Sequence, residues 1–572
     1  MTSYDQRNEK VNIEEISHLN DQEQAETIAD KFSSIPNQYL PLKTKDINVP
    51  PFSDEEIPQF EPAQIWFLLA KLKTNKAIVP GDFPPKLIKM FAAYLAEPLT
   101  DIINASIKRG EYPRIYKVEV CTPIPKKYPH QNTSEIRNIS GLLTFDKIFE
   151  KLLSELMISD MKRKLDPSQY GNQKGISVQH YLVSMIHRIV ESLDNNSRGD
   201  TFAVIANMID WNNAFPRQCP KLGIESFIQN GVRPSLIPVL VNYFQDRKMF
   251  VKWHGCQSVI RSINGGGPQG ATLGLLEYLS QSNNSADIVS ESDRFKFLDD
   301  LTILEIVNLL IVGISSFNLK VQVANDLPTH NQFIDPANLK SQSWLNEINL
   351  WTKNKKMMIN EQKTKTMIIN YTDKYQFTTR LKINNAPVEV INSTKLLGTI
   401  ITDDLKWDQN TNYIVRKANA RMELLRKVAS FGASKEDLKT IYIMFVRSQL
   451  EQNSVVWHSS ITEENKCDLE RVQKSAVRII MGDQHQGYKK SLSYLDLDTL
   501  NERRDKLCLK FALRGAKNEK FSHMFPLNDK NHEMKTRNVE KYFIQHTRSA
   551  RLQNSPLIYM QKLLNENEQK PP

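Results

Sequence analysis

The stretch Phe295-Lys-Phe-Leu-Asp-Asp-Leu-Thr-Ile-Leu304 places two adjacent aspartates, Asp299 and Asp300, inside an apolar, strand-like run. Neighbouring side chains on a regular strand point to opposite faces, so a straight strand would separate these two carboxylates. A tight turn lets at least one of them face a common site. Taken alone, the pair is also typical of a solvated hairpin turn. The stretch therefore predicts a β-hairpin whose role depends on its surroundings.

A third carboxylate, Asp210, closes the apolar run Thr201-Phe-Ala-Val-Ile-Ala-Asn-Met-Ile-Asp210. On its own, Asp210 would be an ordinary helix cap. Carboxylates at strand ends can converge on divalent metal ions, and two ions roughly 3.5–4 Å apart clamp the attacking and leaving oxygens of a phosphoryl transfer. Mg²⁺ prefers oxygen ligands of this kind. The three aspartates are therefore candidates for one metal-assisted site.

A glycine-rich loop, Gly265-Gly-Gly-Pro-Gln-Gly-Ala-Thr-Leu-Gly274, lies between these runs in the sequence. Its glycines permit positive φ and close backbone approach, which suits contact with a base pair or a phosphate as well as a plain flexible loop. It does not match the phosphate-binding pattern Gly-x-x-x-x-Gly-Lys-Ser/Thr. Phe215 follows Asp210 by five residues, and its ring is either a core aromatic or a platform beneath an incoming sugar.

Several cations are placed to meet phosphates. Lys126, Lys127 and Arg137 flank an extended segment, and fixed cations can clamp a triphosphate. Further cations crowd two predicted helices near the C-terminal end, in rows that suit a phosphate backbone: Arg416, Lys417, Arg421, Arg426 and Lys427 on one, and Arg471, Lys474 and Arg478 on the other. Tyr413 and Trp457 are candidates to stack on bases. A solvated basic surface is the alternative for each group.

The composition is that of an ordinary globular protein, with 572 residues, 40% of them hydrophobic and 24% charged. The net charge of +10 is uneven, because residues 1–60 hold 12 acidic and 5 basic side chains. A basic body suits a polyanionic partner such as nucleic acid. No apolar run reaches the roughly 18 residues of a membrane span, and no apolar signal peptide opens the chain. We therefore expect an intracellular protein, in the nucleus or cytoplasm, with no membrane partner.

The five cysteines lie far apart and form no C-x-x-C pair, so neither a zinc site nor a disulfide framework is predicted. The pattern of elements is helical at first, mixed in the centre and nearly all helical after about residue 408, which indicates an α+β fold. Residues 1–60 are expected to be an acidic leader or linker with a short helix near residues 23–32. A hairpin across Gly255 is predicted, and residues 304–340 are expected to be mostly helix, then loop.

Taken in order, the motifs resemble those of the reverse transcriptases of non-LTR (LINE-type) retrotransposons, over roughly residues 60–515. Asp210-Trp-Asn-Asn-Ala-Phe215 resembles motif A of that family, Gly267-Pro-Gln-Gly-Ala-Thr-Leu-Gly274 motif B, and Phe297-Leu-Asp-Asp300 motif C. Further stretches carry the resemblance: Leu72-Lys-Thr-Asn-Lys-Ala77, Arg137-Asn-Ile-Ser140, Gln169-Tyr-Gly171, Lys363-Thr-Lys365 and Lys395-Leu-Leu-Gly398.

The resemblance implies a right-hand polymerase with helical fingers (61–200), a mixed α/β palm on an antiparallel sheet (201–407), a helical thumb (408–515) and a C-terminal extension (516–572). It implies an RNA-directed DNA polymerase that extends a DNA 3′-hydroxyl on an RNA template with dNTPs. Its metal ion would be Mg²⁺, or Mn²⁺ in its place. By the same resemblance, Asp210 and Asp299 bind the metals and Asp300 supports them.

The resemblance also implies roles for residues around the nucleotide. Phe215 would be the steric gate against ribonucleotides, Gln269 with Gly270 would lie near the incoming nucleotide, and Lys126 with Arg137 would meet its triphosphate. The thumb region is expected to contact nucleic acid through Arg416, Lys417, Arg421, Arg471 and Lys474.

The sequence departs from the family pattern in ways that leave a second hypothesis open. Pro216 follows Phe215 where an aspartate is usual, Asn138 replaces a proline, and Gln173 replaces an arginine. No metal ligand is lost, but a catalytically inactive, polymerase-derived nucleic-acid-binding protein is the alternative. An RNA-templated RNA polymerase is disfavoured by the ring of Phe215. No endonuclease fits in the first 60 residues and no RNase H acidic set is evident after residue 515, so an endonuclease domain is expected to be separate or lost.

Overall fold

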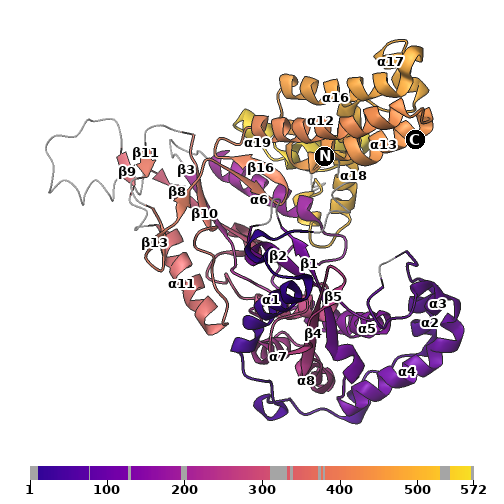
Figure 1. Cartoon of the computed structure of the whole chain (residues 1–572). Coiled ribbons are helices and arrows are strands. Elements are labelled where there is room, and N and C mark those ends of the chain that lie inside the picture. The colour runs from indigo at the N-terminus through magenta and orange to yellow at the C-terminus, as the bar shows by residue number, and fades with distance from the viewer. Residues whose placement is uncertain are drawn as a thin grey trace, which may run out of the picture. The chain divides into compact units, whose positions relative to one another are not determined.

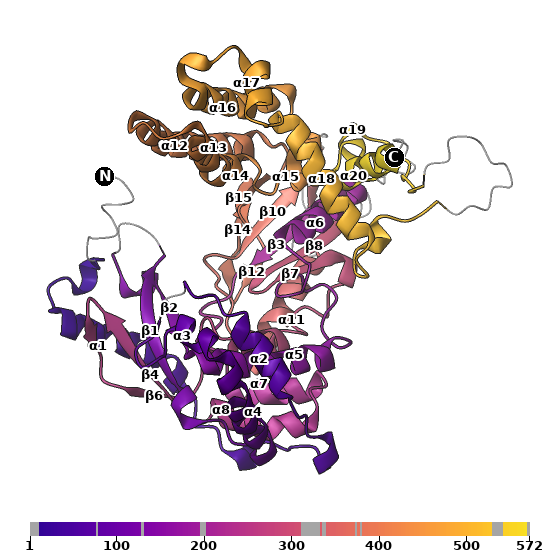
Figure 2. The same cartoon turned by 90° about the vertical axis from the view of Figure 1, so that its right-hand side faces the viewer.

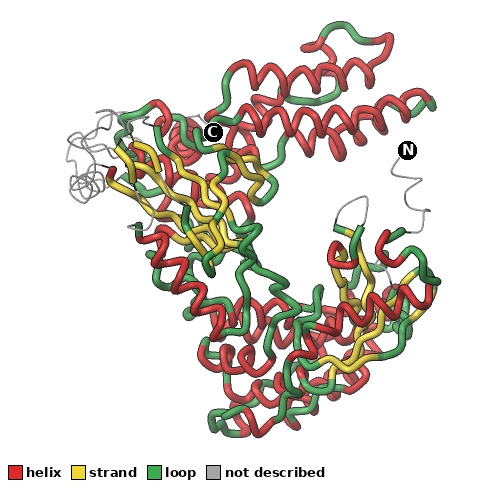
Figure 3. The backbone as a smooth tube through the Cα atoms, turned by 60° about the vertical axis from the view of Figure 1, so that its left-hand side comes forward, coloured by secondary structure: helices red, strands yellow, loops and turns green. Residues whose placement is uncertain are grey.

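The computed structural model describes residues 11–75, 78–126, 131–194, 202–309, 332–334, 339–371, 375–377, 380–528 and 541–568. The chain forms two compact units. Unit 1 consists of Met1–Pro167, Trp211–Ala286 and Glu347–Ile359, and unit 2 of Ser168–Asp210, Asp287–Asn346 and Asn360–Pro572. Both units combine helices with strands (Figure 3), so the mixture of α and β structure expected from the sequence is confirmed.

The two units cut across the domain boundaries expected from the sequence. The expected palm, residues 201–407, contributes Trp211–Ala286 and Glu347–Ile359 to unit 1 and the remainder to unit 2. The strand that ends at Ile209 pairs within the sheet of unit 2, whereas the segment after Asp210 packs within unit 1. Sequence continuity therefore does not define the compact bodies here.

Unit 1 contains a mixed sheet in the strand order β2-β1-β4-β5, with β6 also paired to β4. Strands β1 (Val118–Pro125) and β2 (Ile136–Gly141) are antiparallel, and β1 runs parallel to β4 (Arg247–Trp253). Strands β5 (Cys256–Gln257) and β6 (Arg261–Ile263) return antiparallel to β4. This return confirms the hairpin that the sequence predicted across Gly255.

The N-terminal segment is part of the core of unit 1, which corrects the expectation of a linker. Helix α1 (Asp21–Ser34) begins with a capping box between Asn20 and Glu23 and packs on β4 (Figure 2). Its apolar stripe, including Ile28, is buried with Val251 and Trp253. The acidic side chains Glu26 and Asp30 pair with Arg261 on β6. Local charge suggested a solvated leader, but its cationic partner lies more than 200 residues away in the sequence.

Further helices complete the described part of unit 1. They are α2 (Pro62–Ala70), α3 (Pro85–Met90), α4 (Ala92–Arg109), α5 (Thr144–Met161), α7 (Pro220–Gln229), α8 (Ile237–Phe244) and α9 (Thr272–Gln281). Helix α2 packs on α4, and α9 packs on both α5 and α7. Helix α9 begins directly after the glycine-rich loop, so this packing fixes the far end of that loop.

Unit 2 is built on a sheet in the order β14-β10-β3-β8-β7, with β3 (Phe202–Ile209) at its centre. Strand β3 is antiparallel to β8 (Asp300–Asn308) and to β10 (Lys365–Ile369). Strand β7 (Arg294–Phe297) is antiparallel to β8, whereas β14 (Glu389–Val390) is parallel to β10. Helix α6 (Val178–Asp194) packs on β3 and β7 (Figure 2).

The alternation of strand residues explains how both faces of this sheet are covered. Val204 and Ala206 belong to the large core that includes α6. Ala203 and Ile205 pack instead with Leu339, just before α11 (Lys340–Asn354). The helix expected from residue 304 is wrong for 304–308, because these residues pair with β3 as part of β8. The expectation for residues 310–331 and 335–338 lies outside the described residues.

Between residues 408 and 516 the chain is almost entirely helical, as predicted, and two further helices lie within residues 550–568. Its helices are α12 (Asp408–Ser430), α13 (Lys435–Ile441), α14 (Ser448–Leu450), α15 (Ser454–Trp457), α16 (Glu463–Met481), α17 (Tyr488–Tyr494), α18 (Leu500–Ala516), α19 (Ala550–Gln553) and α20 (Pro556–Glu568). Helices α12 and α16 pack together (Figure 1), and α18 packs on α20. Leu557, Ile558 and Met560 are buried in the main core, so the described part of the C-terminal extension is integral to unit 2.

Short strands complete unit 2: β9 (Gln332–Ile334) with β11 (Tyr375–Phe377), β12 (Lys382–Ile383) with β13 (Ala386–Pro387), and β15 (Ser393–Leu396) with β16 (Thr399–Thr402). Among the helices that the structure describes, none combines the length and the apolar character required to cross a bilayer.

Candidate active site

The paired aspartates lie at the hairpin between β7 and β8, as the sequence predicted. Phe297 pairs with Asp300, which leaves Leu298 and Asp299 as a two-residue turn. Leu298 has a φ of 55°, a left-handed conformation that is uncommon for a branched residue. Asp299 is exposed at the turn, and Asp300 is half-buried at the start of β8. The turn therefore places the two adjacent carboxylates at the same end of the sheet.

Asp210 directly follows the neighbouring strand, β3, at the same end of the sheet. In the antiparallel pair of β3 and β8, Ile209 is opposite Leu301. Asp210 follows Ile209 and Asp300 precedes Leu301, so the two aspartates terminate adjacent strands side by side. The Asp210 carbonyl accepts a hydrogen bond from the Asn360 amide at 2.8 Å, and its amide donates to Thr364 Oγ1 at 3.3 Å. These bonds fix the strand end that carries the carboxylate.

Asp300 is influenced electrostatically by both of the other carboxylates. Burial, followed by the negative charges of Asp299 and Asp210, raises the pKa of Asp300 to about 7. Lys363 Nζ lies 3.8 Å from Asp210 Oδ2, but both side chains are largely exposed, so this ion pair is weak. This end of the sheet therefore carries an excess of negative charge in a partly buried position.

This donor set suits a hard divalent cation. Within the described parts of the chain, no three histidine, cysteine or acidic side chains are arranged as a complete metal-binding group. Mg²⁺ is usually held by one or two carboxylates together with substrate phosphates, so an open set of carboxylate oxygens is compatible with it. The mutual repulsion that raises the pKa of Asp300 is also what a bound cation would relieve.

A neighbouring segment, Gln169-Tyr-Gly171, holds the carboxylate turn in place, although from the sequence it entered only as part of the family resemblance. Gln169 Oε1 accepts hydrogen bonds from the backbone amides of Gly171, at 2.8 Å, and Leu298, at 3.0 Å. The Tyr170 amide also donates to the Lys296 carbonyl at 2.7 Å. A Cβ on Gly171 would lie 2.6 Å from the Leu298 nitrogen, so only glycine fits there. The sequence holds no spacing signal for this contact, because its two sides are more than 120 residues apart.

In unit 1, the segment after Asp210 is joined to the glycine-rich loop. The Phe215 carbonyl accepts a hydrogen bond from the Gly267 amide at 3.1 Å, and the Phe215 ring stacks on Tyr278 with centroids 5.3 Å apart. A Cβ on Gly267 would lie 1.9 Å from Gln218 Oε1, so any other residue here would displace the buried Gln218 side chain. The half-buried ring of Phe215 therefore contributes to packing, in line with the alternative interpretation of Phe215 as a core aromatic.

Gln269 and Gly270 belong to the same loop, just before α9. The Gln269 carbonyl accepts a hydrogen bond from the Ser140 amide, at the end of β2, at 2.8 Å. Gly270 is exposed and has a φ of 115°. The structure therefore connects the loop both to Phe215 and to the β1–β2 hairpin of unit 1.

The two cations of that hairpin lie on one face. Arg137 on β2 is opposite Ile124 on β1. The Lys126 amide donates to the Glu135 carbonyl at 2.7 Å, which continues the strand pairing beyond Pro125. By alternation, Lys126 shares the exposed face of Ile124 and Arg137. Lys127 lies outside the described residues.

The basic helices of unit 2 differ in how free their cations are. Arg416 is exposed on α12, whereas Arg421 donates to the Phe445 carbonyl at 2.8 Å and so anchors the adjoining helix. On α16, Arg471 and Lys474 are exposed. Arg471 pairs with Asp468, three residues earlier on the same helix. The outward basic face predicted for α16 is therefore present.

An aromatic and basic cluster forms around Tyr413, and it includes Lys395, which entered from the sequence only as part of the family resemblance. Lys395 Nζ and Lys417 Nζ lie 4.9 and 5.0 Å from the centre of the Tyr413 ring. Lys395 also donates to the Tyr413 hydroxyl at 2.7 Å, and this bond lowers the pKa of Tyr413. The proposed stacking role of Trp457 is wrong, because its side chain is fully buried.

The comparisons with known proteins agree with the family that the sequence resembles. No family model matches the chain. A probable RNA-directed DNA polymerase from transposon X-element of Drosophila melanogaster is 21% identical over 439 residues, 75% of this chain and 45% of the relative. A probable RNA-directed DNA polymerase from transposon BS of the same species is 24% identical over 328 residues, 57% of this chain and 34% of the relative.

A third relative is the RNA-directed DNA polymerase from mobile element jockey of Drosophila funebris, 25% identical over 224 residues, 37% of this chain and 23% of the relative. The chain thus spans less than half the length of these curated relatives. Among solved structures, apo telomerase from Candida tropicalis aligns with a TM-score of 0.35 and 13% identity over 74% of this chain and 71% of that chain. The sequence relatives of the chain are thus RNA-directed DNA polymerases of non-LTR transposons, at 21–25% identity.

Proposed function

We propose that this chain is the polymerase region of an RNA-directed DNA polymerase, which extends a DNA 3′-hydroxyl on an RNA template with dNTPs. The main support is that Asp210, Asp299 and Asp300 lie at the same end of the unit 2 sheet. There, burial and the charges of Asp299 and Asp210 raise the pKa of Asp300 to about 7. Two-metal phosphoryl transfer requires carboxylates on a rigid platform of this kind. The transposon relatives are named for the same activity.

In this proposal, Asp210 and Asp299 hold Mg²⁺, or Mn²⁺ in its place, and Asp300 supports them. The bound ions would stabilise negative charge on the oxygens of the transferred phosphoryl group. The strand pairing of β3 with β8 holds the carboxylates, and Gln169 holds the turn that presents Asp299. The half-buried position of Asp300 limits access of water, which strengthens its interactions with nearby charges.

Unit 1 supplies the residues proposed to bind the nucleotide. Lys126 and Arg137, on the exposed face of the β1–β2 hairpin, would meet the triphosphate. Phe215 would limit the space at the sugar, and Gln269 with Gly270 would lie along the nucleotide. Their shared hydrogen-bonded framework supports this assignment, because it holds the loop and the hairpin as one piece.

The right-hand architecture is part of the same proposal. The sheet β14-β10-β3-β8-β7 would form the core of the palm, and α12 to α18 would form the thumb. Template and primer would contact Arg416, Lys417, Arg471 and Lys474, where cations at the surface can follow a phosphate backbone. Arg421 would contribute less to nucleic-acid binding, because its guanidinium also donates a hydrogen bond to the Phe445 carbonyl.

The deciding experiment is primer extension on a primed RNA template by the Asp299→Asn variant. We expect extension to fall by at least roughly 100-fold, as is usual when a group that stabilises the transition state is removed, while RNA binding is unchanged. Glu291→Gln is the matched control, because Glu291 is exposed just before β7 and outside the turn. Unchanged extension by Asp299→Asn would contradict the metal site. Tight RNA binding without extension by the unaltered chain, in Mg²⁺ and in Mn²⁺, would favour the inactive binding protein.

A further inference from the structure

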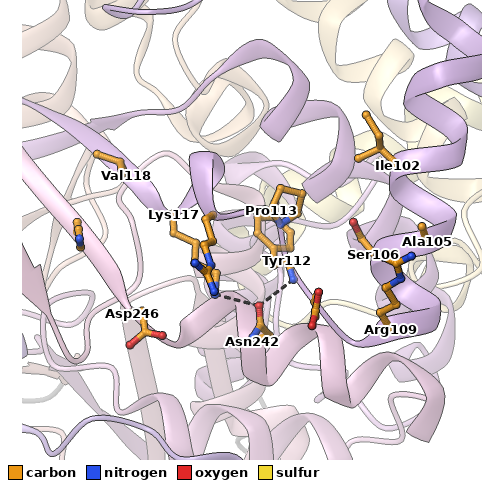
Figure 4. Close-up of a pocket in the computed structure, with 13 residues that line it drawn as sticks. Ile102, Ala105, Ser106, Arg109, Tyr112, Pro113, Lys117, Val118, Asn242 and Asp246 are labelled. Atoms are coloured by element: carbon orange, nitrogen blue, oxygen red, sulfur yellow. Dashed lines mark hydrogen bonds between the residues drawn. The ribbon is translucent and has the colours of Figure 1, made fainter.

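Unit 1 contains a cavity of about 650 Å³ that is separate from the glycine-rich loop and from the exposed face of the β1–β2 hairpin (Figure 4). It lies between the end of α4, the turn Arg114–Lys117, the start of β1, the end of α8 and the start of β4. Cations, carboxylates and apolar side chains all contribute to its walls. A volume of this size is in the range of small-molecule sites, roughly 300–1,000 Å³.

A buried lysine lies at the base of this cavity. Lys117 is only 5% exposed, and its Nζ donates to Asn242 Oδ1 at 2.9 Å (Figure 4). The same oxygen accepts a hydrogen bond from the Tyr112 amide at 2.8 Å, so the amide oxygen is held in place. Burial lowers the pKa of Lys117, and the nearby Asp246 partly opposes that effect. A buried ammonium held by a neutral amide is stabilised when an anion enters beside it.

The rim adds further positive charge. Arg109, Arg114 and Lys248 line the cavity and are exposed, against the carboxylates of Glu111 and Asp246. Together with Lys117, the cavity lining holds four cations and two carboxylates, an excess of two positive charges. Guanidinium groups bind phosphate and carboxylate alike through paired hydrogen bonds, so two arginines favour an oxyanion of this kind over a simple halide.

The remaining walls suit more than a phosphate. Ile102, Ala105 and Pro113 form an apolar side, and Ile102 is 49% exposed. A flat apolar group such as a nucleobase can lie against such a wall, while carboxylates can accept hydrogen bonds from sugar hydroxyls or base amino groups. We propose that this cavity binds a nucleotide, with its phosphate toward Lys117 and the rim arginines and its base against the apolar wall.

The nucleotide could come from two sources that share this chemistry, a free nucleotide or one unit of a nucleic-acid strand. The test uses the purified full chain in EDTA, so that binding which requires a divalent metal is suppressed. One arm titrates a fluorescent adenosine triphosphate, and the other a fluorescent 5′-phosphorylated single-stranded RNA of twelve nucleotides. Binding in either arm that depends on the cavity residues supports the proposal, and the arm that binds more tightly identifies the source.

Charge-reversing variants show whether binding depends on the cavity. Lys248→Glu and Arg114→Glu alter exposed residues, so the fold should survive, and thermal unfolding checks this. We expect each to weaken binding about 10-fold or more, the effect of removing one charge-assisted hydrogen bond. Lys252→Glu is the matched control, because Lys252 is exposed on the same strand, β4, roughly 13 Å farther along at ~3.3 Å per residue.

Photocrosslinking with 8-azidoadenosine triphosphate gives an independent readout. We expect labelled peptides from residues 102–118 or 242–248, and loss of that labelling in Lys117→Met. Equal weakening by Lys252→Glu would show general electrostatic attraction and overturn the proposal. Equal affinity for a poly-glutamate peptide would overturn it as well, because such a peptide has no nucleobase to lie against the apolar wall of Ile102, Ala105 and Pro113. Absence of binding in both arms would have the same consequence.

Discussion

Glu277 shows how a single residue in α9 couples packing to pH. Its side chain is fully buried, and a Cβ on Gly223 of α7 would lie 2.6 Å from its Oε1. The bare backbone at Gly223 therefore gives the Glu277 carboxyl the space it occupies between α7 and α9. Burial raises the pKa of Glu277 to about 8, although Arg247 opposes the shift. The carboxyl is therefore protonated at neutral pH in the folded protein.

The Glu277→Gln variant should be more stable than the parent at pH 8 and nearly equal to it at pH 4.5. In the unfolded chain this carboxyl ionises near its ordinary pKa of 4.5, whereas the folded state holds the proton up to a pKa of about 8. Its effect on stability therefore worsens as the pH rises from 4.5 to 8, by roughly 4 kcal/mol. Thermal unfolding across this range measures the difference, with Glu225→Gln on α7 as the control. A constant difference at all pH values would contradict the argument.

At Phe215, the proposed gate rests on the size of the ring. The Phe215→Ala variant should incorporate ribonucleotides at least about 10-fold more readily than the parent, since removing a bulky group admits the 2′-hydroxyl. Primer extension with a single rNTP in competition with its dNTP measures this preference. Phe215→Tyr keeps the ring and should keep the discrimination. Unchanged selectivity in the alanine variant would leave Phe215 only its packing role against Tyr278.

At the scale of elements, the carboxylate turn depends on the segment that lies beside it. Residues 168–171 pair with β7 through the Tyr170 and Lys296 backbones, and Gln169 Oε1 receives the Leu298 amide. Leu298 keeps a left-handed φ of 55° in this setting. A strained conformation of this kind persists only where surrounding contacts fix it. The β7–β8 hairpin and residues 168–171 therefore act together to position Asp299 and Asp300.

Replacing Gly171 with alanine should displace this turn. The new Cβ would lie 2.6 Å from the Leu298 nitrogen, so the backbone must shift. Because small misplacements in a catalytic site can cost on the order of 100-fold, we expect kcat for primer extension to fall by about 10- to 100-fold with RNA affinity retained. Gly255→Ala is the control for backbone strain away from the turn, since its φ of 91° disfavours alanine although its Cβ would meet no atom within 4 Å. Full activity of Gly171→Ala would show that residues 168–171 do not position the carboxylates.

At the scale of the whole molecule, the net charge of +10 favours polyanionic partners, but its distribution matters more than its sum. Part of the acidic N-terminal charge is paired with Arg261 in unit 1. Arg471 and Lys474 are exposed on α16, although Arg471 also pairs with Asp468. Binding through such side chains should release counterions and weaken with salt.

The double variant Arg471→Ala, Lys474→Ala should bind a primed RNA template more weakly and with a shallower salt dependence. Removing one cation that touches a phosphate reduces the slope of log affinity against log salt by roughly 0.7–0.9. We therefore expect a decrease of about 1.5 for the pair. Fluorescence anisotropy between roughly 50 and 300 mM salt provides the measurement. Lys221→Ala, on the exposed side of α7, is the control, and an equal weakening with that variant would contradict a specific interaction.

The sequence alone determined the chemistry of the candidate site, because strand-like runs that end in aspartate, the Asp-Asp turn and the glycine-rich loop are local patterns. It also determined the long helices after residue 408 and the outward cations of α16, which follow from apolar periodicity. Tertiary structure decided the rest. Residues 304–308 became strand through pairing with β3, Trp457 became core, and the N-terminal helix packed on β4.

The support of the carboxylate turn by Gln169 and Gly171, and the cluster of Lys395 with Tyr413, were likewise decided only in three dimensions. The physical reason is common to all these cases. Periodicity along a chain states which face of an element is apolar, but it does not state which distant surface will cover that face. That choice depends on packing and hydrogen bonding between segments up to hundreds of residues apart, which local sequence does not record.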